Sequence, residues 1–113
     1  MEKVNNRSLF IGRWQPFHKG HKLLIEKTLR EGNNVVIAVR DTEINKDNPY
    51  SYKARCKMIM EQMSDWEDRL EIIKIPDIDE VCHGRKVGWK IREIKLDKKT
   101  EQISGTSIRK KMI

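Results

Sequence analysis

The chain has 113 residues, of which 37% are apolar and 36% are charged, and its formal net charge is +7. This length predicts a single domain, residues 1–113, with a small core, because such a chain buries roughly two-thirds of its unfolded surface. The longest apolar run, 35–39, is far shorter than the roughly 20 residues of a membrane-spanning helix. We expect no membrane span or secretory signal, and the two cysteines favour a reducing, cytoplasmic setting.

The net positive charge lies in the last third of the chain. Residues 1–80 contain 14 basic and 14 acidic residues, whereas residues 81–113 contain ten basic and three acidic ones. A basic segment suits nucleic acid, an anionic membrane surface or a phosphorylated small ligand. It can also be a solvated lysine-rich surface, so the charge alone leaves the partner open.

The first predicted elements are a strand and a helix. The apolar run 8–11 stops at Gly12, which predicts a buried strand that ends in a turn. Residues 19–30 predict a helix with Gly32 as its C-terminal cap. The apolar positions of this helix are Leu23, Leu24, Ile25 and Leu29.

A second strand and helix follow. The β-branched run 35–39 is apolar on both sides, as in a central parallel strand. Residues 41–50 are polar and contain Asn-Pro, which predicts a loop. Ser51 then predicts the N-cap of a helix that runs to about residue 63. Its expected inner face is Ala54, Met58, Ile59 and Met63.

Three more elements complete the predicted fold. Residues 70–75 predict a third strand, 89–96 a fourth, and Ser104 the start of a last helix. Alternating strands and helices are typical of an α/β fold, here a Rossmann-like parallel sheet with flanking helices. In such sheets ligands bind beyond the carboxyl ends of the strands.

Residues 12–21, Gly-Arg-Trp-Gln-Pro-Phe-His-Lys-Gly-His, follow the first strand and open the first helix. His18 and His21 are three residues apart, so both imidazoles lie on one face beside the unpaired N–H groups of the helix. Gly20 leaves room between them, and Arg13 adds positive charge. We predict a polyphosphate pocket, the alternative being histidines that only cap the helix. No Walker A or zinc-protease spacing is present, so we expect no metal ligated by the chain.

A second candidate segment, 103–109, reads Ile-Ser-Gly-Thr-Ser-Ile-Arg at the start of the last predicted helix. Ser104 and Thr106 supply hydroxyl groups, and Arg109 lies one turn further with a planar guanidinium that can clamp phosphate. The alternative is an ordinary serine cap beside a surface arginine. Together with the first segment, it favours phosphate binding.

These two segments resemble the signature motifs His-x-Gly-His and Ile-Ser-x-Thr-x-x-Arg of the HxGH nucleotidylyltransferase superfamily. Residues 12–18, residues 46–50 with Arg55, and residues 75–78 further resemble the archaeal-type nicotinamide-nucleotide adenylyltransferases. The resemblance covers most of the chain and implies an HxGH nucleotidylyltransferase fold of minimal size.

The resemblance implies transfer of a nucleoside monophosphate. An acceptor phosphate attacks the α-phosphorus of a nucleoside triphosphate in line, and pyrophosphate leaves. The sequence context favours AMP from ATP, with a phosphorylated acceptor such as nicotinamide mononucleotide. The implied cofactor is Mg²⁺, bound through the nucleotide phosphates.

The resemblance also implies roles for individual residues. The histidines would contact the α- and β-phosphates, while the second motif would hold the β- and γ-phosphates. The implied catalytic residues are His18, His21, Lys46 and Arg109. The implied nucleotide-binding residues are Gly12, Arg13, Gln15, Phe17, His18, Gly20, His21, Ser104, Thr106 and Arg109.

The acceptor side departs from the archaeal-type pattern. Those enzymes carry an additional segment with acceptor-site residues, where this chain has only residues 79–87. Arg85 and Trp89 are therefore the candidate acceptor-binding residues. The alternative is a surface turn in which Trp89 packs on the sheet.

Two other functions stay open at this point. One is a cytidylyltransferase acting on a phosphorylated alcohol or sugar. A remote alternative is a basic nucleic-acid-binding module, but that function needs several aromatic platforms and the basic third contains only Trp89. We also expect a homo-oligomer as one way for so small a domain to shield its surface.

Overall fold

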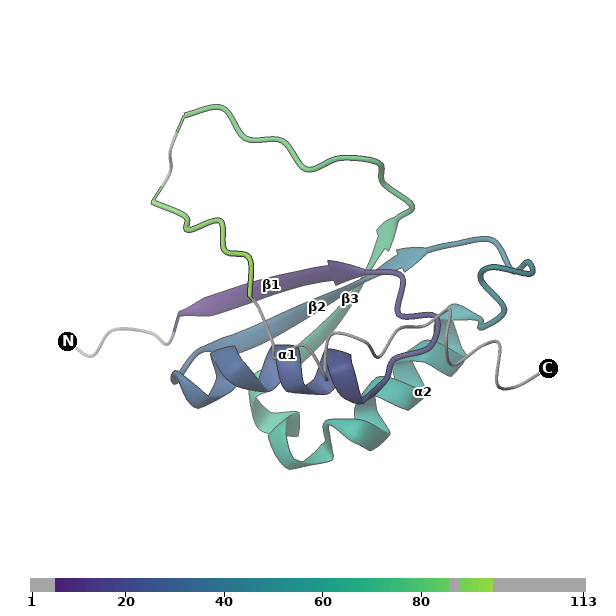
Figure 1. Ribbon diagram of the computed structural model, residues 1–113, viewed down its shortest axis with the longest axis horizontal. Coiled ribbons are helices and arrows are strands. Elements are labelled where there is room, and N and C mark those ends of the chain that lie inside the picture. The colour runs from purple at the N-terminus through teal and green to yellow at the C-terminus, as the bar shows by residue number, and fades with distance from the viewer. Residues whose placement is uncertain (1–5, 86–87, 95–113) are drawn as a thin grey trace.

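The computed structural model describes residues 6–85 and 88–94. In chain order the elements alternate between strands and helices, as expected (Figure 1). They are β1 (Arg7–Gly12), α1 (Lys19–Arg30), β2 (Asn34–Asp41), α2 (Tyr52–Gln62), a short 3₁₀ helix η1 (Ser64–Arg69) and β3 (Leu70–Pro76). The predicted strands and helices up to residue 76 are thus confirmed.

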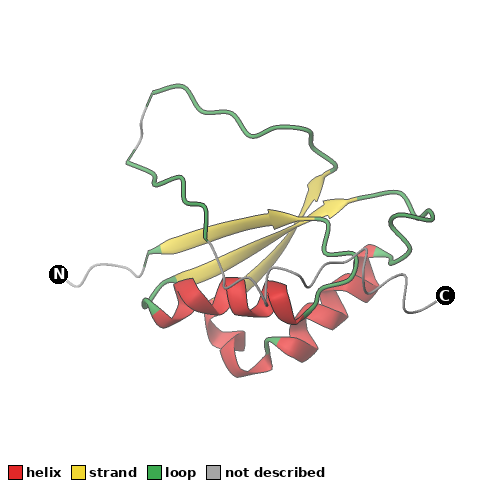
Figure 2. Ribbon diagram, in the orientation of Figure 1, coloured by secondary structure: helices red, strands yellow, loops and turns green. Residues whose placement is uncertain are grey.

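The three strands form a parallel sheet in the order β1-β2-β3. Phe10 of β1 pairs with Ile37 of β2, which pairs with Ile72 of β3. Both α-helices cover the same face of the sheet (Figure 2), because right-handed crossovers that advance in one direction place them there. Because the strands are parallel, the loops after β1 and β2 and the segment after β3 all begin at the C-terminal ends of the strands. We call this end of the sheet its carboxyl edge.

The core lies between β2 and the two helices. The side chains of Val35, Ile37 and Val39 alternate along β2 on the helix-facing side and are almost fully buried. The buried cluster consists of Trp14, Phe17, Ile25, Leu29, Val35, Ile37, Val39, Ile59 and Met63. Two members, Trp14 and Phe17, belong to the loop before α1, so this loop is packed into the core.

The ends of α1 follow the capping rules. Gly32 has φ 96°, and its N–H donates to the Leu29 carbonyl, while the Asn33 N–H donates to the Thr28 carbonyl. These two hydrogen bonds form a Schellman motif, which confirms Gly32 as the C-terminal cap of the helix. Ile25 and Leu29 are buried as expected, whereas two expected inner positions, Leu23 and Leu24, are only half-buried.

Helix α2 begins as predicted, with the Ser51 hydroxyl accepting from the Ala54 N–H at 3.1 Å. Ile59 and Met63 face the core, but Ala54 and Met58 are only half-buried. The remaining buried position is Arg55, an arginine with no exposed surface. The inner face of α2 is thus polar at its first turn.

The fourth predicted strand, 89–96, is wrong over the residues described. Residues 88–94 form no strand, and Trp89 is 72% exposed and packs on no sheet. The alternation there is imperfect, and a strand needs a partner edge. Arg92 instead makes a bidentate pair with Glu31 at the C-terminal end of α1, with distances of 2.8 and 3.0 Å. The predicted last helix lies outside the described residues.

Within the described ranges, every helix is too short or too polar to cross a bilayer.

Candidate active site

The loop from β1 to α1 starts with a constrained turn. Trp14 has φ 55°, a left-handed conformation that a large side chain adopts only when its surroundings hold it. Its indole Nε1 donates to the Ala38 carbonyl at 3.1 Å. The ring lies so close to Gly12 that a Cβ there would come within 2.8 Å of Trp14 Cε2. The glycine at position 12 is therefore required by packing.

Gln15 ties this loop to the loop after β2. Its Nε2 donates to Thr42 Oγ1 at 3.0 Å and to the Tyr50 carbonyl at 2.9 Å, and its Oε1 accepts from the Tyr50 N–H at 2.9 Å. The side chain is only 5% exposed. The structure thus places Gln15, expected to bind nucleotide, as a cross-link beneath the site.

His18 and His21 begin α1 as a reciprocal capping pair. His18 is the N-cap, and its Nδ1 accepts from the Gly20 N–H at 3.0 Å. His21 Nδ1 accepts in turn from the His18 N–H at 3.2 Å. The two rings stack with centroids 3.6 Å apart. The expected shared face is confirmed, and both histidines also take part in capping the helix.

This capping geometry determines which ring nitrogen carries the proton. Because both Nδ1 atoms accept backbone N–H groups, a neutral imidazole must carry its proton on Nε2. Among the described residues, no group hydrogen-bonds to Nε2 of His18 or His21. Each histidine therefore keeps one N–H donor available for a ligand.

The surroundings keep the imidazoles uncharged. Burial lowers the pKa of His18. Burial and then the neighbouring His18 charge lower the pKa of His21 to about 3. His21 lies edge-on to Trp14 and against Phe17, with ring centroids 4.8 and 5.5 Å away. At neutral pH the pair thus offers two neutral donors, aided by the positive end of the helix dipole.

Two exposed cations lie in the loops that follow β1 and β2. Arg13 is exposed, and its Nη1 lies 3.5 Å from Asn48 Oδ1 in the loop after β2. Lys46 is exposed in the same loop. Asn45 Oδ1 shapes this loop by accepting the N–H groups of residues 47 and 48. The structure therefore brings the Lys46 loop beside the histidine loop, as a joint phosphate site requires.

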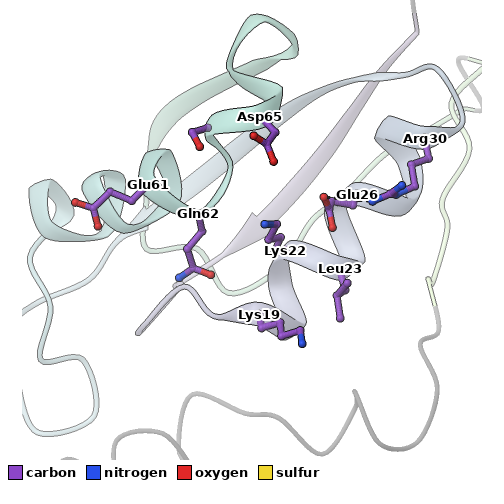
Figure 3. Close-up of a pocket in the computed structure, with 9 residues that line it drawn as sticks. Lys19, Lys22, Leu23, Glu26, Arg30, Glu61, Gln62 and Asp65 are labelled. Atoms are coloured by element: carbon purple, nitrogen blue, oxygen red, sulfur yellow. Dashed lines mark ion pairs between the residues drawn. The ribbon is translucent and has the colours of Figure 1, made fainter.

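A surface groove of about 590 Å³ lies elsewhere, between α1 and the end of α2 (Figure 3). Its charged lining balances, with three basic and three acidic side chains. These are Lys19, Lys22, Arg30, Glu26, Glu61 and Asp65. Gln62, which also lines the groove, donates to the Phe17 carbonyl at 2.8 Å. A balanced lining gives no preference for a polyphosphate, so we place the site at the histidines.

Of the remaining predicted residues, only Arg85 and Trp89 lie among the described residues, and they are not joined to this site. Arg85 and Trp89 are exposed, and their segment is anchored through Arg92 at the opposite end of α1 from His18. The residues of the second motif, Ser104, Thr106 and Arg109, lie outside the described residues. Within the described ranges, no three side chains of the metal-ligating types cluster together.

Two residues that support the site, Trp14 and Arg55, belong to the resembling stretches but were not predicted as site residues. Trp14 reveals itself only through its left-handed backbone, which no local pattern indicates. Arg55 did leave a signal, because it lies four residues before Ile59 and eight before Met63 on the buried face of α2. A charged residue in such a row indicates a buried polar contact.

Known proteins match both this sequence and this fold. Residues 9–79 match the cytidylyltransferase-like family. A nicotinamide-nucleotide adenylyltransferase from Methanococcus aeolicus is 31% identical over 134 residues, which covers 95% of this chain and 77% of the relative. Another, from Methanoculleus marisnigri, is 29% identical and covers 73% of this chain. The chain spans only 52% of that second relative.

A solved structure agrees with the sequence matches. The bifunctional NMN adenylyltransferase/ADP ribose pyrophosphatase from Francisella tularensis superposes with a TM-score of 0.55 at 34% identity, over 66% of this chain and 23% of that one. The same protein has been solved in complex with AMP and a manganese ion. The chain therefore belongs to the cytidylyltransferase-like family, and within it to the nicotinamide-nucleotide adenylyltransferases.

Proposed function

We propose that this chain transfers AMP from ATP to nicotinamide mononucleotide and releases pyrophosphate. The observation that carries the proposal is the capping pair of His18 and His21, which leaves two neutral Nε2–H donors at a helix N-terminus. Such donors suit phosphate oxygens on which negative charge grows. The names of the relatives supply the acceptor.

In the proposed reaction the acceptor phosphate oxygen forms a bond to the α-phosphorus of ATP. The bond from that phosphorus to the bridging oxygen breaks, and its electron pair leaves with pyrophosphate. His18 and His21 donate to the α- and β-phosphate oxygens as charge builds on them. Neither histidine gives up its proton, so the chain contributes positioning and electrostatic stabilisation.

The other proposed contacts extend along the triphosphate. Arg13 and Lys46 approach it from the two loops at the carboxyl edge of the sheet. Gly20 lets the phosphates come close to the helix backbone. Ser104, Thr106 and Arg109 of the second motif take the β- and γ-phosphates. Gly12 and Phe17 act by shaping the loop.

Mg²⁺ fits this arrangement as an ion that is bound to the nucleotide rather than to the protein. A protein-held Mg²⁺ needs several oxygen ligands. Over the described part of the chain, the histidine site offers N–H donors and cations, and no cluster of three metal-ligating side chains lies there. We therefore propose that the ion is coordinated by triphosphate oxygens and neutralises part of their charge. The relative solved with AMP and a manganese ion supports the use of a divalent metal.

A pyrophosphate-release screen tests the proposal. Each of the four nucleoside triphosphates is combined with nicotinamide mononucleotide, glycerol phosphate or a sugar phosphate. Release confined to ATP with nicotinamide mononucleotide supports the proposal. Release from CTP with glycerol phosphate or a sugar phosphate would instead identify a cytidylyltransferase and refute the transfer of AMP to nicotinamide mononucleotide.

A further inference from the structure

Arg55 is a fully buried arginine beneath the carboxyl edge of the sheet. Its side chain comes from the first turn of α2 and has no exposed surface. Among the described residues no carboxylate lies within ion-pair distance of it. A buried charge without a partner costs free energy that an apolar side chain of equal volume avoids. The residue therefore does something that core filling does not explain.

The guanidinium of Arg55 holds the ends of two strands. Its Nη1 donates to the Arg13 carbonyl, just beyond β1, and to the Arg40 carbonyl near the end of β2, both at 2.7 Å. Its Nε donates to the Ser51 carbonyl of its own helix start at 3.2 Å. One side chain thus connects β1, β2 and α2.

The Arg13 carbonyl is a sensitive point of the histidine loop. It belongs to the peptide that leads into Trp14, whose left-handed backbone needs support from its surroundings. The Arg55 bond fixes one side of this turn, and the indole bond to Ala38 fixes the other. His18, the N-cap of α1, lies only four residues after Trp14. A displacement of the turn at Trp14 would therefore move the Nε2–H donors of the two histidines.

A second arginine continues the connection to β3. Arg40, whose carbonyl accepts from Arg55, donates through Nη2 to the Ile78 carbonyl at 2.7 Å and pairs with Asp77 at 2.7 Å. The two arginines therefore link the ends of all three strands. Nη2 of Arg55 is buried without a partner, which leaves one donor beneath this edge uncommitted.

We propose that Arg55 is a positioning residue for nucleotidyl transfer, which fixes the loop that presents the two histidines to the triphosphate. The inference rests on the proposed function, because it assumes that this loop binds phosphate. Arg55 itself touches no substrate, since it has no exposed surface.

The test compares Arg55 with a matched arginine at the other end of the sheet. Arg69 also donates to two carbonyls at 2.7 Å, those of Leu29 and Asn33, but it lies far from the histidine loop in the fold. The variants are Arg55→Lys, Arg55→Met and Arg69→Lys, each measured for thermal unfolding, ATP affinity by calorimetry, and kcat and KM. Measurements are made well below each variant's Tm.

We expect kcat of both Arg55 variants to fall about 100-fold, the loss that a misplacement of about 1 Å produces, with a smaller change in the KM for ATP. Arg69→Lys should lower Tm and leave kcat unchanged. Wild-type kcat in Arg55→Lys, or an equal loss in Arg69→Lys, would overturn the proposal. So would failure of both Arg55 variants to fold, since Arg55 would then serve the fold alone.

The two proposals fail in different ways. A wild-type chain that releases no pyrophosphate from ATP and nicotinamide mononucleotide refutes the proposed function. ATP affinity then decides on Arg55, because the loop holds the triphosphate whichever acceptor follows. Unchanged ATP affinity in Arg55→Lys would in that case overturn the positioning role.

Discussion

The two jobs of His18 can be separated by one pair of substitutions. Nδ1 caps α1 by accepting from the Gly20 N–H at 3.0 Å, while Nε2 is left for the nucleotide. Asparagine is among the best N-cap residues, whereas alanine caps poorly. His18→Asn therefore keeps the cap and loses the phosphate donor, and His18→Ala loses both. Both variants lose the ring that stacks on His21, so their difference isolates the cap.

The expected magnitudes follow from these contacts. Loss of an N-cap costs about 1 kcal/mol, which lowers the Tm of a domain of this size by about 4–8 °C. His18→Ala should therefore unfold about 4–8 °C below His18→Asn. Loss of one transition-state donor costs about 10²–10³ in kcat, and both variants should show it.

Thermal unfolding by circular dichroism and steady-state pyrophosphate release measure the two effects separately. Wild-type kcat in His18→Asn would refute the donor role of Nε2. Equal Tm values for the two variants would refute the capping role of Nδ1.

Three further changes test other parts of the site. Folding stability should fall as the pH drops from about 6.5 towards 3, by at most about 1.4 kcal/mol per pH unit through His21, because its folded imidazole stays neutral while the unfolded one binds a proton. The lowered pKa of His18 adds to this loss in the same direction. Denaturant titration of wild type and His21→Gln should show a steeper acid loss in wild type. Gly12→Ala should displace the Trp14 indole and shift its fluorescence, since the new Cβ would lie 2.8 Å from the ring; an unshifted spectrum would contradict this packing. Arg109→Ala should weaken ATP binding by calorimetry, and unchanged affinity would remove Arg109 from the site.

Local patterns predicted the elements that hydrophobic spacing and caps determine. The run 35–39 became the central strand, and Ser51 and Gly32 marked helix ends. The predicted strand 89–96 is absent over the described residues. A strand forms only where a neighbouring strand pairs with it, and a weak alternation of apolar residues does not indicate whether such a partner exists. The pair between Arg92 and Glu31, 61 residues apart, holds that segment elsewhere.

The candidate site was predicted only as far as local sequence spacing determines it. The spacing of His18 and His21 placed them on one face, which needs only helix geometry. Their ring stacking and lowered pKa values depend on the tertiary packing around them. The choice of Nε2 as donor depends on the backbone N–H groups that each Nδ1 accepts. The spacing of Arg55 from Ile59 indicates a buried position, but the carbonyls that it binds lie 15 and 42 residues away, which no local pattern contains.

Phosphorus NMR on a single reaction mixture tests the central claim most directly. With ATP, nicotinamide mononucleotide and Mg²⁺ present, the account predicts that the dinucleotide diphosphate signal and the pyrophosphate signal rise together, one for one, in wild type. His18→Asn should reduce both rates equally. Unchanged ATP, or orthophosphate in place of pyrophosphate, would contradict the account.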